Sequence, residues 1–249
     1  MHAISVSELD VSWGARVVLP KFCLHVDPGE VLCIVGPGGS GKSTIVRVFE
    51  RLLAGAAVEV GTENLQWRGE STVGVRSCAC LRQQGVSPAI GPVPGVGVGP
   101  IPGVGVGPVP GVGPAAAVLP ESKLDPRQSA ELEQLYATAN ASMADTPKAL
   151  RHFNNFMRVA NAPAELLLFD EPLFSLPQRW AKEVTSRLRT LAESGRTMVV
   201  VTHYLPLARV VADRVALLVD GELIESAPTE DFFSRARHLR TRQYLEWGS

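Results

Sequence analysis

Residues 36 to 43 read Gly36-Pro37-Gly38-Gly39-Ser40-Gly41-Lys42-Ser43 and are followed by Thr44. They match the pattern G-x-x-x-x-G-K-[ST], in which glycines let the backbone curl until its N–H groups and a helix N-terminus face a polyphosphate. Lys42 is expected to reach the outer phosphates, and the Ser43 hydroxyl is expected to bind Mg²⁺. The sequence therefore predicts that these nine residues bind a nucleotide, with ATP and Mg²⁺ as the cofactors.

The residues on either side of this loop support the prediction. Residues 31–35 are an apolar run that predicts a buried strand, and residues 43–49 predict a helix that leaves the loop. The mechanism requires this strand–loop–helix context, which a chance match in a glycine-rich chain would lack.

The composition sets the size and the partners. A chain of 249 residues suits one large domain with a smaller inserted lobe, and a net charge of −1 gives no electrostatic reason to expect nucleic acid as a partner. The four cysteines lie in strand-like runs, and Cys78-x-Cys80 lacks the second pair of a zinc site. We expect buried thiols in a reducing cytoplasm.

The remaining periodicity predicts an α/β fold. Residues 1–35 alternate like antiparallel strands, whereas residues 166–169 and 198–201 are apolar strands separated by a helix over residues 178–194. Near the carboxyl end, Asp220-Gly221 predicts a hairpin turn, and Thr229 is expected to cap a short helix. This order predicts a mostly parallel sheet and an antiparallel amino-terminal lobe.

An octapeptide occurs three times between residues 91 and 114, each copy with a [Val/Ile]-Pro-Gly-Val core. It resembles elastin-like sequence and is interpreted as a low-complexity insertion, with self-association or docking as the alternative. Residues 83–120 contain no charged residue, but prolines from Pro88 to Pro114 exclude a membrane-spanning helix. The first residues do not resemble a signal peptide.

Four further side chains complete a candidate hydrolysis site. Residues 166–169 lead into Asp170 and Glu171, of which Asp170 is expected to join the Mg²⁺ shell and Glu171 to polarise the attacking water. His203 ends the next strand and is expected at the γ-phosphate. Trp13 is expected to stack on adenine.

Gln83 follows the strand-like residues 78–81, so its amide oxygen is expected to contact Mg²⁺ or the attacking water, with Gln84 as a competitor. Any one of these elements alone is a weak signal. Their order and spacing along the chain carry the interpretation.

These motifs resemble those of ATP-binding cassette (ABC) proteins, the nucleotide-binding subunits of membrane transporters. Residues 221–225, 228–233 and 241–245 are similar to the carboxyl end of the ATP-binding subunit of bacterial phosphate importers. The resemblance implies an ATP hydrolase in the cytoplasm, peripheral at the inner face of the membrane. It also implies a dimer with a second ATP-binding subunit, docked on permease subunits.

The chain departs from that family at three places. The Leu-Ser-Gly-Gly-Gln signature is replaced by residues 146–150, which read Thr-Pro-Lys-Ala-Leu, and the Ser-Ala-Leu-Asp loop reads Phe174-Ser175-Leu176-Pro177. The helical lobe is reduced to about residues 122–144. We therefore expect a core with the loop and Gln83 in residues 1–84, an insertion in 85–120, a reduced helical lobe in 121–160 and the rest of the core in 161–249.

Three functions remain open at this point. The first is a subunit of a phosphate-type importer, paired asymmetrically with a subunit that supplies the signature. The second is a soluble, repurposed ATPase or ATP-binding regulator without a permease. The third, a small-molecule kinase, fits less well because the paired carboxylates and His203 match the transporter ATPases.

Overall fold

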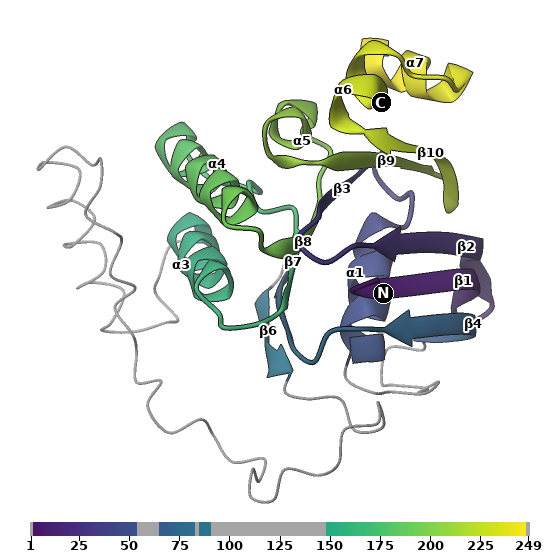
Figure 1. Ribbon diagram of the computed structural model, residues 1–249, viewed down its shortest axis with the longest axis horizontal. Coiled ribbons are helices and arrows are strands. Elements are labelled where there is room, and N and C mark those ends of the chain that lie inside the picture. Colours follow the sequence, from purple (N-terminus) through teal and green to yellow (C-terminus); the bar gives the residue numbers. More distant parts are fainter. Residues whose placement is uncertain (1, 54–64, 83–84, 91–147, 248–249) are drawn as a thin grey trace, which may run out of the picture.

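The protein forms two β-sheets with helices on both sides of the larger sheet, in a computed structural model that describes residues 2–53, 65–82, 85–90 and 148–247 (Figure 1). The smaller sheet is antiparallel and has the order β2-β1-β4. Its strands are β1 (Ile4–Trp13), β2 (Arg16–Val26) and β4 (Leu65–Val73). The predicted antiparallel lobe at the amino terminus is confirmed.

The larger sheet has the order β10-β9-β3-β8-β7-β5-β6. Its five inner strands are parallel to one another, and β10 and β6 pair in antiparallel fashion at the two edges. The strands are β3 (Val31–Val35), β5 (Cys78–Arg82), β6 (Gly85–Ile90), β7 (Leu166–Asp170), β8 (Thr197–Val201), β9 (Arg214–Val219) and β10 (Glu222–Pro228). The predicted mostly parallel α/β sheet is therefore confirmed.

The helices cover the two faces of this sheet (Figure 1). They are α1 (Lys42–Leu53), α3 (Lys148–Ala160), α4 (Gln178–Glu193), α5 (Leu205–Val211), α6 (Thr229–Ser234) and α7 (Leu239–Trp247). Helix α4 starts where the sequence predicts and ends one residue earlier. In the described part of the chain, no helix is long and apolar enough to cross a membrane.

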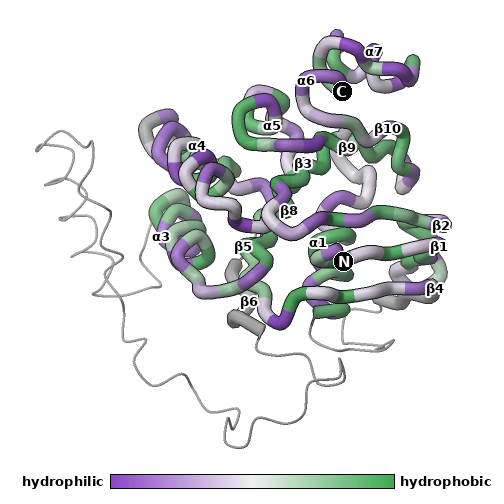
Figure 2. Tube along the Cα trace, in the orientation of Figure 1, coloured by the Kyte–Doolittle hydropathy of each residue, from purple (hydrophilic) through white to green (hydrophobic). Residues whose placement is uncertain are grey.

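The core consists of two apolar clusters, one on each face of the larger sheet. Strand β3 is fully buried, with Leu32 and Ile34 facing α1 and the smaller sheet while Val31, Cys33 and Val35 face the other helices. Figure 2 shows the matching hydropathy, with apolar residues along the central strands and hydrophilic stretches along α4 and α7. Strands buried on both faces need continuous apolar runs, which is why β3, β7 and β8 were recognisable from sequence.

Part of the expected insertion belongs to the sheet. The structure places strand β6 at Gly85–Ile90, the first six residues of the range 85–120. Its position at the edge suits Pro88, because an edge strand can tolerate a residue without a backbone N–H. The repeat at 91–114, the expected helix at 122–144, Thr146, Pro147, Gln83 and Gln84 lie outside the described residues.

Two local predictions are wrong. Cys23 is exposed, whereas the other three cysteines are buried as expected. Thr229 is the first residue of α6 rather than its cap, and its hydroxyl donates to the carbonyl oxygen of Ala212 at 2.6 Å. The side chain therefore ties α6 to the end of α5 instead of satisfying its own helix.

Candidate active site

The predicted phosphate loop connects the end of β3 to the start of α1, at the carboxyl ends of the parallel strands. Added side chains would collide at two of its glycines, because a Cβ on Gly36 would lie 2.0 Å from the Leu218 carbonyl oxygen and one on Gly41 would lie 2.8 Å from Leu19 Cδ2. Gly38 and Gly39 have open space around the same position. The loop is thus packed against the protein at Gly36 and Gly41, while Gly38 and Gly39 in its middle leave space for a ligand.

Lys42 is held inside this loop. Its Nζ donates to the carbonyl oxygens of Gly36 at 2.8 Å and Pro37 at 2.7 Å, and the residue is only 7% exposed. Burial lowers the pKa of Lys42, and the nearby carboxylates of Glu171 and Asp170 oppose that shift. The structure therefore places a buried ammonium group between the loop backbone and the two carboxylates.

Ser43 and Asp170 meet across the site. The Ser43 hydroxyl donates to Asp170 Oδ1 at 2.9 Å, which joins the first turn of α1 to the end of β7. Burial raises the pKa of Asp170, and the hydrogen bond from Ser43 acts against the rise. A hydroxyl oxygen and a carboxylate oxygen at one point are ligands that Mg²⁺ prefers, so these residues fit the Mg²⁺ that the sequence predicts.

Glu171 and His203 also lie together. His203 Nδ1 is 2.8 Å from Glu171 Oε1, and the His203 backbone N–H donates to the same oxygen at 3.2 Å. The Thr202 hydroxyl donates to the other carboxylate oxygen at 3.3 Å. Glu171 has a φ of 51°, a conformation uncommon for a residue with a side chain and often found at functional sites.

Trp13 borders the site from the smaller sheet. Its indole N–H donates to the Thr44 hydroxyl at 3.3 Å, and the Arg47 guanidinium lies 5.2 Å from its ring centroid. The ring is therefore held beside the first turns of α1. Together with Gly36 to Thr44, Asp170, Glu171 and His203, it makes one connected constellation.

The sequence reasoning missed two buried side chains near this constellation. The Tyr244 hydroxyl of α7 is buried beside the Gly36 backbone, and burial raises its pKa. His152 of α3 shares a hydrogen bond between its Nε2 and the Pro172 carbonyl oxygen at 3.1 Å, and burial lowers its pKa. The sequence assigned neither residue a role at the site, and only the tertiary structure shows where they lie.

Two of the segments in which the sequence predicts a departure from the family include described residues. The segment Phe174–Pro177 leads directly into α4, with Pro177 as the residue before its first turn and Ser175 at a φ of 58°. The Lys148 Nζ lies 5.0 Å from the Phe174 ring centroid. Within one subunit, this lysine therefore packs against the loop after β7.

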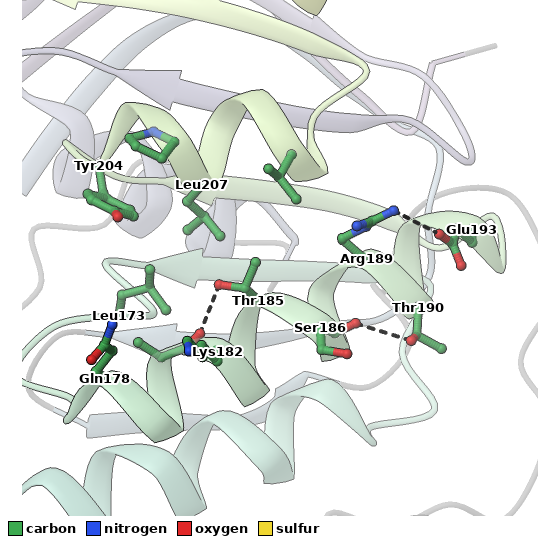
Figure 3. Close-up of a pocket in the computed structure, with 13 residues that line it drawn as sticks. Leu173, Gln178, Lys182, Thr185, Ser186, Arg189, Thr190, Glu193, Tyr204 and Leu207 are labelled. Carbon is green, nitrogen blue, oxygen red and sulfur yellow. Dashed lines mark hydrogen bonds and ion pairs between the residues drawn. The ribbon is translucent and has the colours of Figure 1, made fainter. Parts of the chain in front are cut away.

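A groove of about 630 Å³ lies between α4 and α5 (Figure 3). It begins beside Leu173 and Tyr204, which follow the Glu171 and His203 segments, and it continues along hydroxyl-bearing residues of α4. The Thr185 and Thr190 hydroxyls donate to carbonyl oxygens of their own helix, at 2.8 and 3.1 Å. The groove adjoins the site but takes no wall from the phosphate loop, so we place the chemistry at the loop.

Comparison with known proteins agrees with this geometry. The sequence profile of the family described as ABC transporter matches residues 19–88. The chain is 30% identical over 253 residues to the L-cystine transport system ATP-binding protein TcyN of Escherichia coli K12, covering 99% of this chain and 98% of that protein. It is also 30% identical over 250 residues to the arginine transport ATP-binding protein ArtM of Bacillus subtilis 168, covering 98% of each chain.

A further relative is also an ATP-binding protein of a transport system, and a solved structure shares the fold. The chain is 29% identical over 248 residues to the glutamine transport ATP-binding protein GlnQ of Geobacillus stearothermophilus, covering 94% of this chain and 93% of that protein. In fold it resembles a metal-chelate type ABC transporter in an inward-facing conformation, with a TM-score of 0.56 at 18% identity over 93% of this chain and 85% of that one. The chain therefore belongs to the ATP-binding subunits of ABC transporters, a family of ATPases that bind ATP with Mg²⁺ and hydrolyse it.

Proposed function

We propose that this chain is the ATP-hydrolysing subunit of an importer for amino acids, located in the cytoplasm against permease subunits at the inner face of the membrane. The observation that carries the proposal is the convergence of Lys42, Ser43, Asp170, Glu171 and His203 at one edge of the sheet. Family membership supplies the transporter context.

Each residue has a role in this proposal. Ser43 and Asp170 would hold Mg²⁺, which would neutralise charge on the phosphates when bound. Glu171 accepts a proton from the attacking water, and His203 holds that carboxylate in place through its ring and its backbone N–H. The phosphate-loop residues and Lys42 bind the polyphosphate, and Trp13 orients the base. Gln83 keeps its proposed place at the metal or the water, although it lies outside the described residues.

Amino acids are the proposed solute class because the relatives reported above are named for cystine, arginine and glutamine transport. The phosphate-type resemblance of residues 221–245 receives no support from these relatives. The solute is expected to contact the permease and its binding protein rather than this chain, so its class is an inference from relatives alone.

The proposed assembly is a dimer with a second ATP-binding subunit. Residues 146–150 lack the signature serine and glycines that would grip the phosphate of an opposing subunit, and Pro177 stands where the family has an aspartate. Both changes affect contacts across the dimer, whereas the residues that bind ATP within this chain are present. We therefore propose an asymmetric pair in which a partner with an intact signature closes over the site of this chain.

Uptake measurements in cells that naturally carry this chain test the proposal. Deleting the gene should abolish the uptake of at least one labelled amino acid and leave phosphate uptake unchanged. Restoring the wild-type gene should rescue uptake, and a Lys42→Ala gene should not. Loss of phosphate uptake would reject the amino-acid assignment. Uptake unaffected by deletion, with ATP binding intact in the purified chain, would favour the repurposed ATPase.

A further inference from the structure

A cluster of three metal-ligating side chains lies at the opposite end of β3 from the phosphate loop. His2 precedes β1, His25 is the penultimate residue of β2, and Asp27 begins the turn that leads into β3. One ligand atom from each residue lies within 4.8 Å of the others, and all three side chains are exposed. The turn residues 28–30 and the five residues of β3, which span about 16 Å, separate this cluster from Gly36.

The chemistry of the cluster is that of a transition-metal site. His2 Nδ1 is 2.5 Å from Asp27 Oδ1, and the His2 and His25 ring centroids are 4.6 Å apart with an interplanar angle of 40°. Two imidazoles and one carboxylate suit Zn²⁺ and its neighbours in the first transition row. Ligand atoms bound to one tetrahedral ion stand about 3.4 Å apart, so binding requires only that the His2–Asp27 contact opens and His25 swings inward.

The backbones of His25 and Asp27 are fixed by a hydrogen-bond network that involves neither imidazole. Arg214 of β9 donates to the His25 carbonyl oxygen at 2.6 Å and also to Glu30 Oε1 at 2.6 Å. Glu30 in turn accepts the Asp27 backbone N–H at 2.7 Å. The Arg214 charge is thus matched by Glu30, and His25 and Asp27 start from fixed backbone positions.

The third ligand, His2, is held near the other two by the pairing of its neighbour Ala3 with β2. The Ala3 backbone N–H donates to the Val26 carbonyl oxygen at 2.8 Å, which fixes the residue after His2 against the residue between His25 and Asp27. The three ligand side chains are therefore close together and their backbones are anchored, which reduces the ordering that metal binding requires.

We propose that His2, His25 and Asp27 bind one divalent transition-metal ion, with Zn²⁺ as the representative ion and water in the remaining coordination position. Bound metal would join the start of β1 to the turn before β3. Because the unfolded chain does not hold these three residues together, the ion would stabilise the native state. The site is separate from the nucleotide site and does not depend on the transport assignment.

The proposal can be tested by titrating the full-length, metal-free chain with Zn²⁺ in the absence of nucleotide. Calorimetry then measures both the binding of Zn²⁺ and the Tm. One equivalent of Zn²⁺ should bind to the wild type and raise its Tm. The variants His2→Gln and His25→Gln should each bind at least about tenfold more weakly, since loss of even an outer-shell partner of a metal costs 10–100-fold. Because both imidazoles are exposed, these variants should keep the fold.

Two control variants separate this site from adventitious binding. His238→Gln removes an exposed histidine of another element, and Cys23→Ser removes the exposed thiol of β2. Neither should change the Zn²⁺ affinity. Wild-type protein that binds no Zn²⁺, or a His2→Gln/His25→Gln double variant that binds as tightly as the wild type, would overturn the proposal.

Discussion

The Glu171 carboxylate is held by His203 at two points, the ring Nδ1 at 2.8 Å and the backbone N–H at 3.2 Å, both on Oε1. Glu171 directly follows Asp170, the last residue of β7, and its backbone N–H donates to the Val201 carbonyl oxygen at 2.8 Å. The residue that is proposed to polarise water is thereby attached to the last residue of β8 through its backbone and to the residues just after β8 through its side chain.

Replacing Glu171 with glutamine should remove the proton acceptor while leaving the shape of the site intact. We expect ATP turnover to fall by about 10²–10⁴-fold, with ATP affinity changed only a few-fold. Steady-state turnover and equilibrium ATP binding measure the two quantities, and Glu193→Gln at the exposed end of α4 is the control. No measurable turnover in either protein would mean that the chain alone is inactive and needs a partner. Measurable turnover that survives Glu171→Gln would remove this residue from the mechanism.

Lys42→Ala should abolish tight ATP binding. The substitution removes a buried ammonium that now donates to two loop carbonyls and is aimed at the outer phosphates. Charge-assisted hydrogen bonds contribute about 1.5–3 kcal/mol each, so the affinity should fall by more than about tenfold. Equilibrium dialysis with labelled ATP gives the result. The control is Lys182→Ala, because Lys182 lies on α4 and lines the groove between α4 and α5. Equal ATP affinity in Lys42→Ala and wild type would discredit the assignment of the loop.

The part of the site that sequence predicts is the part that short motifs encode. Gly36 to Thr44 and Asp170-Glu171 lie next to apolar strands, so their positions follow once those strands are placed in a parallel sheet. The contacts of Tyr244 and His152 could not be predicted, because each joins elements that are distant in the chain. Strand β6 was missed because glycine and proline give it a weak strand signal, and an edge position tolerates both.

Predictions of side-chain position from local sequence patterns also failed at two residues. Thr229 satisfies the sequence pattern of a helix cap, yet its hydroxyl donates to Ala212, seventeen residues earlier in the chain. Cys23 occurs in an alternating strand, where periodicity places half of the residues outward. In both cases the element was predicted correctly and the direction of one side chain was not.

Glu225 should make the stability of the carboxyl-terminal helices depend on pH. Burial alone would raise its pKa, but the Thr241 hydroxyl and the backbone N–H groups of Arg237 and His238 favour the carboxylate, so the pKa is lowered from 4.5. The N–H groups donate at 2.8 and 3.0 Å. A lowered folded-state pKa means that the stabilisation is present above pH 4.5 and is lost as the pH falls through the folded value.

Thermal unfolding of Glu225→Gln and wild type at several pH values tests this expectation. The wild type should have the higher Tm at pH 7, and the difference should shrink below the ordinary glutamate pKa of 4.5. Glu246→Gln, on an exposed residue of α7, is the control and should show a smaller difference at pH 7. A Tm difference that stays constant down to acid would show that the Glu225 charge does not supply the stabilisation.

Glu50 and Arg82 form an ion pair between α1 and the end of β5. Arg82 Nε donates to Glu50 Oε2 at 3.0 Å, and the Glu50 residue is only 4% exposed. Because Arg82 is partly exposed and Glu50 is not, Arg82→Met would leave a buried charge without this partner. Loss of one member of a buried pair costs about 3–5 kcal/mol, whereas replacing both members with apolar residues is often close to neutral.

Urea unfolding should therefore rank three variants. Arg82→Met should lose most stability, and the double variant Glu50→Leu/Arg82→Met should recover much of it. Arg189→Met is the matched control, because Arg189 and Glu193 form an exposed pair at 3.7 Å that should contribute less than about 1 kcal/mol. A double variant as unstable as Arg82→Met would mean that the guanidinium acts through its other contacts rather than through Glu50. Since α1 carries Lys42 and β5 leads into Gln83, recovery of stability without recovery of ATP turnover would show that the pair also positions the two sides of the nucleotide site.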